Sequence, residues 1–177
     1  EGSILIDGID ISQIDPADLR KKLSYVPQDI HLFRNTIKNN ILGNYKFVDD
    51  EWMLECSKVS GTDEFVKLHP MGYDMPIGER GAGLSGGQRQ SVGIARALVN
   101  NSNIWLFDEP TNAMDQTSET NILNNLKENI ENKTLLLVTQ KMNMLDLATR
   151  IIVMNNGQKV LDGEKMEIIK KLGVNNG

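Results

Sequence analysis

The sequence has almost no cysteine. Cys56 is the only one in 177 residues, so no disulfide can form within the chain. This excludes the disulfide-dense scaffolds of small secreted proteins and is typical of a reducing compartment. Cys56 lies at helical spacing from Trp52 and Val59, which favours a small core residue over a reactive thiol.

Long apolar runs and an excess of basic charge are also missing. Apolar stretches such as 135–138 are far shorter than the roughly 18 residues that a membrane-spanning helix needs, and the chain opens with no signal peptide. The formal net charge is −5, which argues against a general nucleic-acid-binding surface. We therefore expect a soluble chain that has no nucleic-acid partner.

What the sequence does contain is an alternation of strand and helix patterns. Turn signals at Asp7-Gly8 and at 155–157, each between apolar residues, predict two β-hairpins. The continuous apolar runs at 104–107 and 134–139 are typical of buried parallel strands, and a helical pattern separates them. These patterns predict an α/β fold with parallel strands.

The remaining segments are mostly helical and carry local start signals. A short strand is expected at 23–26, stopped by Pro27, and a loop at 69–83. Helices are expected to begin after Asp15 and Thr36, and to run from Asp49 or Asp50 to Val59, over 61–68, from about Ser85 to Val99, from Thr117 or Ser118 to about Ile130, and from Glu164 to Leu172. We expect residues 28–100 to form a helical subdomain inserted into an α/β core of residues 1–27 and 101–177.

The start of the helix at Ser85 has the chemistry of an anion site. A helix N-terminus carries free N–H groups and partial positive charge. Ser85 is placed to cap the helix, Gly86 and Gly87 let the backbone approach a phosphate closely, and Gln88 adds a side-chain amide. The alternative is an ordinary capped helix, for which two glycines would be costly. We call Ser85–Gln88 the anion platform.

Two carboxylates close the apolar run at 104–107. An aspartate at the end of a strand, here Asp108, can hold Mg²⁺ directly or through water. The neighbouring Glu109 can act as a general base on water. The alternative is that the pair caps the next helix, which Pro110-Thr111 makes less favourable.

Taken in order, these motifs resemble those of ABC-type ATPases. Leu84–Gln90 resembles the signature motif, and Ile104–Asp108 resembles the Walker B strand, with Glu109 as the catalytic carboxylate. The segments that resemble the remaining family motifs are Tyr25–Gln28 (the Q-loop), Ile77–Gly81 (a loop of the exporter class) and Asn112–Asp115 (the D-loop). The resemblance covers essentially the whole chain and implies a P-loop NTPase-like core.

The resemblance implies a role for each site residue. Asp108 would organise Mg²⁺, Gln28 would contact Mg²⁺ and the attacking water, and Glu109 would activate that water. The anion platform would contact the γ-phosphate of ATP held by a second ABC ATPase subunit, with Asp115 at the same interface. The family therefore implies a head-to-tail dimer with two ATP molecules between its subunits.

The chain departs from the family in two ways. It contains no G-x-x-x-x-G-K-[ST] phosphate loop, which in the family precedes the strand that resembles Ser3–Asp7. Because the chain also begins without methionine, we expect an N-terminally truncated domain that is inactive alone. Second, Gln140 stands where the family usually has histidine, so catalysis would be slowed, or the protein would be a non-hydrolysing regulatory subunit.

Features of the exporter class suggest the partners. Residues 72–81 resemble that class, and 111–115 resemble bacterial type I secretion ATPases. The resemblance implies a transmembrane domain in the same polypeptide and a place at the cytoplasmic face of a bacterial inner membrane. ABC ATPases of DNA maintenance are disfavoured because 28–85 lacks heptads and cysteine pairs, and soluble ABC proteins of translation usually carry two motor domains. The G-x-G-x-x-G match at 81–86 lacks the preceding strand of a dinucleotide fingerprint.

In the full-length protein, the substitution Gln140→His is expected to raise ATP turnover, because an imidazole can shuttle a proton and carry charge whereas an amide cannot. Steady-state phosphate release measures this. A rate that stays flat or falls would contradict the interpretation of Gln140 as the slowing residue.

Overall fold

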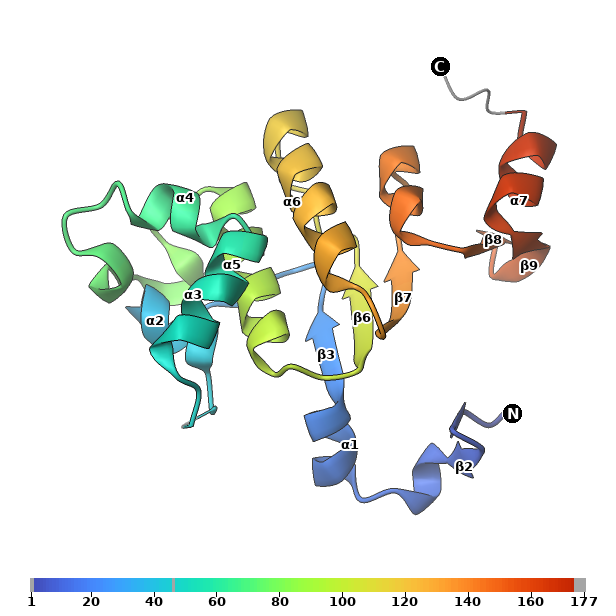
Figure 1. Ribbon diagram of the computed structural model, residues 1–177, viewed down its shortest axis with the longest axis horizontal. Helices are drawn as coiled ribbons and strands as arrows, with labels where there is room; N and C mark the ends of the chain where they lie inside the picture. The colour runs from blue at the N-terminus through green and yellow to red at the C-terminus, as the bar shows by residue number, and fades with distance from the viewer. Residues whose placement is uncertain (1, 46, 174–177) are drawn as a thin grey trace. The chain divides into compact units, whose positions relative to one another are not determined.

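The computed structural model describes residues 2–45 and 47–173, and its elements follow the order that the sequence predicts (Figure 1). The chain divides into two units, Glu1–Val138 and Thr139–Gly177. Each unit is described by itself.

A three-stranded parallel sheet forms the first unit's framework. Its strands, in spatial order, are β3 (Leu23–Val26), β6 (Ile104–Asp108) and β7 (Thr134–Val138). Val26 lies opposite Phe107, and Asp108 lies opposite Val138. The predicted parallel strands are confirmed, and their carboxyl ends meet at one edge of the sheet.

One face of this sheet is buried, partly by α5 (Gly86–Val99). Val26 and Phe107 are buried on this face. The residues that alternate with them, Tyr25 and Leu106, are exposed and half-buried. The Ser24 hydroxyl donates to the carbonyl of Ala97 in α5 at 2.6 Å and accepts a bond from the Ser102 hydroxyl at 2.7 Å. These bonds join β3 to the carboxyl end of α5.

The helical segments between β3 and β6 pack on α5. They are α2 (Ile37–Leu42), α3 (Asp50–Val59) and α4 (Thr62–Val66). The predicted caps are confirmed for two of them, since Thr36 accepts from Asn39 N–H and Asp49 accepts from Trp52 N–H. Cys56 is buried in α3, and burial raises the pKa of its thiol to about 12, as expected of an inert core residue.

The expectation of a loop at 69–83 is wrong in part. This stretch contains β5 (Pro76–Ile77), which pairs antiparallel with β4 (Asn35–Thr36), and two 3-10 turns, η2 (Gly72–Asp74) and η3 (Glu79–Gly81). A two-residue strand is too short to leave a periodic pattern. Its partner lies some forty positions earlier in the chain, so local sequence gives no sign of the pairing.

The first hairpin and its following helix form as predicted. β1 (Leu5–Ile6) pairs antiparallel with β2 (Ile9–Asp10). Asp7 and Gly8 both have positive φ, as a two-residue hairpin turn with the sheet's twist requires. A 3-10 turn, η1 (Ile11–Gln13), leads to α1 (Pro16–Lys22), whose cap Asp15 accepts from Ala17 N–H at 2.7 Å.

Helix α6 (Gln116–Asn129) begins earlier than predicted. Its N-cap is Asp115 rather than a residue at Thr117 or Ser118. The Asp115 carboxylate accepts from the Ser118 N–H at 3.0 Å and from the Ser118 hydroxyl at 2.8 Å. A carboxylate is as good an N-cap as a hydroxyl, so three neighbouring candidates compete and local sequence does not choose between them.

The second unit contains the other predicted hairpin. β8 (Arg150–Asn155) pairs antiparallel with β9 (Gln158–Glu164), with a register shift between Val153 and Met154. Its remaining helices are η4 (Met142–Leu147) and α7 (Lys165–Lys171). Buried Ile151, Ile168 and Ile169 form its core. Hydrogen bonds from Arg150 and then Lys159 hold the pKa of the Asp162 carboxyl at about 2.

The other face of the parallel sheet is open and apolar. Tyr25 is 58% exposed, Leu136 59% and Val138 55%. Among the described residues, β3 and β7 are also the sheet's edge strands. Exposed apolar faces beside unpaired strand edges favour association.

A polypeptide of residues 1–177 is therefore expected to self-associate through this face. Leu136→Lys places a charge on it and should shift the polypeptide toward monomer. The matched control Leu68→Lys alters a leucine that is 81% exposed outside the sheet and should leave association unchanged. Light scattering over a concentration series measures this, and an unaltered chain that stays monomeric throughout would refute it.

Candidate functional site

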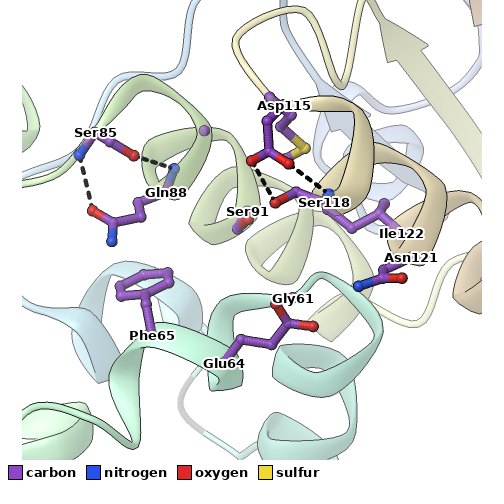
Figure 2. A pocket seen from close by; sticks show the side chains of 12 residues that line it. Gly61, Glu64, Phe65, Ser85, Gln88, Ser91, Asp115, Ser118, Asn121 and Ile122 are labelled. Carbon is purple, nitrogen blue, oxygen red and sulfur yellow. Dashed lines mark hydrogen bonds between the residues drawn. The ribbon is translucent and has the colours of Figure 1, made fainter.

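The N-terminus of α5 is built as a capping box (Figure 2). The Ser85 hydroxyl oxygen accepts a bond from the Gln88 N–H at 3.2 Å. In return, the Gln88 side-chain oxygen accepts a bond from the Ser85 N–H at 2.9 Å. The reciprocal pair fixes both side chains of the anion platform. Sequence analysis predicted the Ser85 cap but not the returning bond from Gln88, although serine followed three residues later by glutamine is the pattern of a capping box.

In the capping box, the side chains of Ser85 and Gln88 act as acceptors, so their own hydrogen-bond donors remain available to a ligand. The Ser85 hydroxyl hydrogen and the Gln88 side-chain NH₂ group are not needed for the two capping bonds. As the first two residues of the helix, Gly86 and Gly87 have amides without an intrahelical acceptor. Donors that the capping box does not use, together with the positive end of the helix dipole, fit an anion such as a phosphate group.

The structure gives a second reason for glycine at positions 86 and 87, which the sequence did not reveal. A Cβ atom added to Gly86 would lie 3.0 Å from the Cβ of Ala113, and one added to Gly87 would lie 3.2 Å from the Ala113 carbonyl oxygen. The first turn of α5 therefore packs directly on the loop that follows Glu109. Glycine at these positions permits this contact as well as the approach of a ligand.

A pocket of about 220 Å³ lies beside the platform. Ser85, Gln88 and Asp115 line one side, and Glu64 and Phe65 of α4 line the side that faces them in Figure 2. Sequence analysis predicted the helix at 61–68 but gave it no part in a site. No signal in the sequence joins it to Ser85, because the contact is made only by the packing of α4 on α5.

Asp115 has a structural task in addition to lining this pocket. Backbone and side-chain hydrogen bonds from Ser118 lower the pKa of its carboxyl, so it stays charged. Because these bonds cap α6, the position of Asp115 is fixed by the helix that it begins.

Asp108 and Glu109 lie at the carboxyl end of β6. Asp108 is half-buried, whereas Glu109 is only 8% exposed and has φ of 45°. Its N–H donates to the Val138 carbonyl at 2.9 Å, so the chain leaves the sheet sharply after Asp108. Since α6 is capped by Asp115, the alternative of Asp108 and Glu109 as helix caps is excluded.

Gln28 lies at the same edge of the sheet. It follows β3 by two residues, is exposed, and comes just after Val26, which is paired with Phe107 of the neighbouring strand. Parallel neighbours end at one edge, so the topology brings Gln28 and Asp108 to the same side. Gln140 follows β7, is exposed, and belongs to the second unit.

The carboxylates fit a metal that is completed by other ligands. The described residues contain no group of three or more histidine, cysteine, aspartate or glutamate side chains able to hold a metal. Mg²⁺ is commonly bound by one or two carboxylates, together with phosphate oxygens and waters. Asp108 at an open sheet edge suits that kind of site and does not suit a closed protein cage.

Arg96 and Asn40 join α5 to the segment after Gln28. The Arg96 guanidinium donates to the Asn40 carbonyl at 2.7 Å and to the His31 carbonyl at 3.0 Å, and it lies 5.6 Å from the centre of the Phe33 ring. The buried Asn40 amide bonds both the N–H and the carbonyl of Phe33. Burial lowers the pKa of Arg96. Sequence analysis missed both residues, because the bonds span 56 positions or more.

Comparison with known proteins agrees with this geometry. Residues 1–112 match the ABC transporter family. The chain is 41% identical over 170 residues to the alpha-hemolysin translocation ATP-binding protein HlyB of Escherichia coli O157:H7, and 39% identical over 170 residues to the leukotoxin export ATP-binding protein LtxB of Aggregatibacter actinomycetemcomitans. Each alignment covers 96% of this chain and 24% of the relative, so the chain spans about a quarter of their length.

A solved structure shares the fold. The structure of a bacterial Atm1-family ABC exporter with ATP bound matches with a TM-score of 0.91 and 34% identity, over 97% of this chain and 30% of that one. The predicted ABC ATPase fold is confirmed, and the family implies ATP binding. Among the described residues, no helix is both long and apolar enough to cross a membrane. The α/β fold and the family match together establish that this chain belongs to the ABC transporter family.

Proposed function

We propose that the chain is the ATP-binding and ATP-hydrolysing segment of an ABC exporter. The observation that carries the proposal is the capped helix end at Ser85–Gln88, which keeps unused hydrogen-bond donors, in a chain that also has Asp108 and Glu109 at the carboxyl edge of its sheet. In this proposal a transmembrane domain of the same polypeptide completes the transporter, and the chain works at the cytoplasmic face of a bacterial inner membrane.

Each carboxylate has a separate task in the proposed reaction. Asp108 and Gln28 would hold Mg²⁺, which supplies charge neutralisation for the phosphates when it is bound. Glu109 would accept a proton from the attacking water. Glu109 directly follows Asp108 at the carboxyl end of β6, which supports a role beside the proposed metal.

The anion platform would serve ATP held by a second ABC ATPase subunit. Ser85 is exposed, so a ligand at this helix end can be completed by another molecule. Asp115 lines the same pocket and would lie at the contact between subunits. The match to an exporter with ATP bound supports such an arrangement.

Gln140 supports a slow reaction over a fast one. Its amide can donate to a γ-phosphate but cannot shuttle a proton. The second candidate function, a regulatory subunit that binds ATP without turnover, also draws on Gln140. Binding of ATP without phosphate release by the full-length protein would favour that candidate, whereas the retained Glu109 favours hydrolysis.

The dimer is tested by mixing two inactive variants of the full-length protein. Ser85→Asp keeps a good N-cap but places a carboxylate where the phosphate would bind, and Glu109→Gln removes the base. Each variant alone should lose at least about tenfold in turnover. If the platform acts on the partner's ATP, mixed dimers regain one intact site, and equal mixing should restore up to about a quarter of the unaltered rate.

Ser85→Asn is the matched control, because it also caps the helix but adds no charge. It should retain more activity than Ser85→Asp. If mixing restores no activity while both variants still bind ATP and dimerise, the platform does not act on the partner subunit.

A polypeptide of residues 1–177 is expected to release no phosphate from ATP, because it contains no G-x-x-x-x-G-K-[ST] sequence to hold the β- and γ-phosphates. A phosphate-release assay with Mg²⁺ measures this. Robust release that is insensitive to Glu109→Gln would contradict the expectation.

A further inference from the structure

Gln90 lies on the buried side of α5 and contacts the loop that follows Glu109. It is 5% exposed. Its side-chain NH₂ group donates to the Glu109 carbonyl at 3.3 Å, and its side-chain oxygen accepts from the Ala113 N–H at 2.8 Å. A carbonyl only accepts and an N–H only donates, so the two partners together fix the orientation of the amide.

The loop that Gln90 holds has an unusual backbone. Glu109 has φ of 45°, a region that a residue other than glycine occupies only where its surroundings impose it. The Val138 carbonyl holds the Glu109 N–H at 2.9 Å, and the Glu109 carbonyl accepts from Asn112 N–H at 3.2 Å. The Gln90 amide is a further bond to this carbonyl, and it comes from another element.

The same loop also packs on the start of α5. Positions 86 and 87 have little room for a larger side chain, because Cβ atoms there would lie 3.0 Å and 3.2 Å from atoms of Ala113. Gln90 lies one turn further along the same helix. Helix α5 therefore contacts the loop from Glu109 to Ala113 at three positions: Gly86, Gly87 and Gln90.

We propose that Gln90 is a positioning residue for Glu109. It fixes the backbone of Glu109 against α5, and so sets the direction in which the Glu109 carboxylate points. The inference rests on the proposed function, in which Glu109 activates water. Since the platform would serve the partner's ATP and Glu109 the subunit's own, Gln90 is also a direct link between the two ATP sites within one subunit.

The substitution Gln90→Glu in the full-length protein separates its two bonds. The carboxylate keeps an acceptor for Ala113 N–H but loses the donor to the Glu109 carbonyl. We expect the kcat for ATP hydrolysis to fall by about 10- to 100-fold, with the KM for ATP changing by less than about twofold, because the loss affects the chemical step. An unchanged kcat would overturn the proposal.

Two further variants distinguish a loss of positioning from a general loss of stability. Gln90→Met keeps the size of the side chain but makes neither bond, so it should lower kcat and speed hydrogen exchange at Ala113 N–H, whereas Gln90→Glu should leave that amide protected. Val99→Ala is the matched control, since Val99 is buried at the far end of the same helix. It should lower thermal stability without lowering kcat. An equal loss of kcat in this control would mean that Gln90 has only a general structural role.

A double-mutant cycle tests whether Gln90 acts through Glu109. When Gln90→Glu is added to Glu109→Gln, the single-turnover rate should fall no further, and a full multiplicative loss would overturn the proposal. The proposed function fails separately, if the unaltered protein does not hydrolyse ATP or if Glu109→Gln leaves its rate unchanged. If Glu109→Gln stops hydrolysis and Gln90→Glu does not, only the role of Gln90 is refuted.

Discussion

The structure of the first unit depends on the close packing of α5 against β3, the helices α2, α3 and α4, and the loop that follows Glu109. Nine of its residues are buried: Gln90, Ser91, Val92, Gly93, Ile94, Ala95, Ala97, Leu98 and Val99. In its middle, a Cβ on Gly93 would lie 2.5 Å from a side-chain carbon of Ile30, so only glycine lets the segment after Gln28 approach so closely. A glycine inside a helix costs about 1 kcal/mol relative to alanine, a small cost beside the contact that it permits. Helix α5 therefore holds the Gln28 segment, the sheet and the Glu109 loop in one arrangement.

Local signals were enough to predict most helices. Asp15, Thr36, Asp49 and Ser85 each cap the helix that follows, and each bond spans no more than three positions. The information needed for such a cap lies within a few residues, so the sequence displays it. At Asp115 the signal failed only because three residues within four positions, Asp115, Thr117 and Ser118, could cap α6.

Long-range contacts could not be predicted in this way. The pairing of β4 with β5 joins short segments far apart in the chain, and neither has a pattern of its own. The bond that Arg96 donates to Asn40 and the bond that Gln90 accepts from Ala113 are likewise made only once α5 packs on α2 and on the loop after Glu109. Sequence analysis therefore located the anion platform and the Asp108–Glu109 pair, but it missed the residues that hold them in place. The roles of these site residues and the boundaries of the helical subdomain stay predictions.

The capping box also bears on which nucleotide the protein selects. Each of its two side-chain oxygens accepts a bond within the helix end, which leaves the Ser85 hydroxyl hydrogen and the Gln88 NH₂ group for a ligand. Hydrogens of this kind recognise phosphate oxygens, which are the same in adenine and guanine nucleotides. In the proposed dimer, the anion platform would therefore distinguish ligands by their charge and by the position of their phosphate groups. The choice between bases would depend on side chains that meet the ring itself.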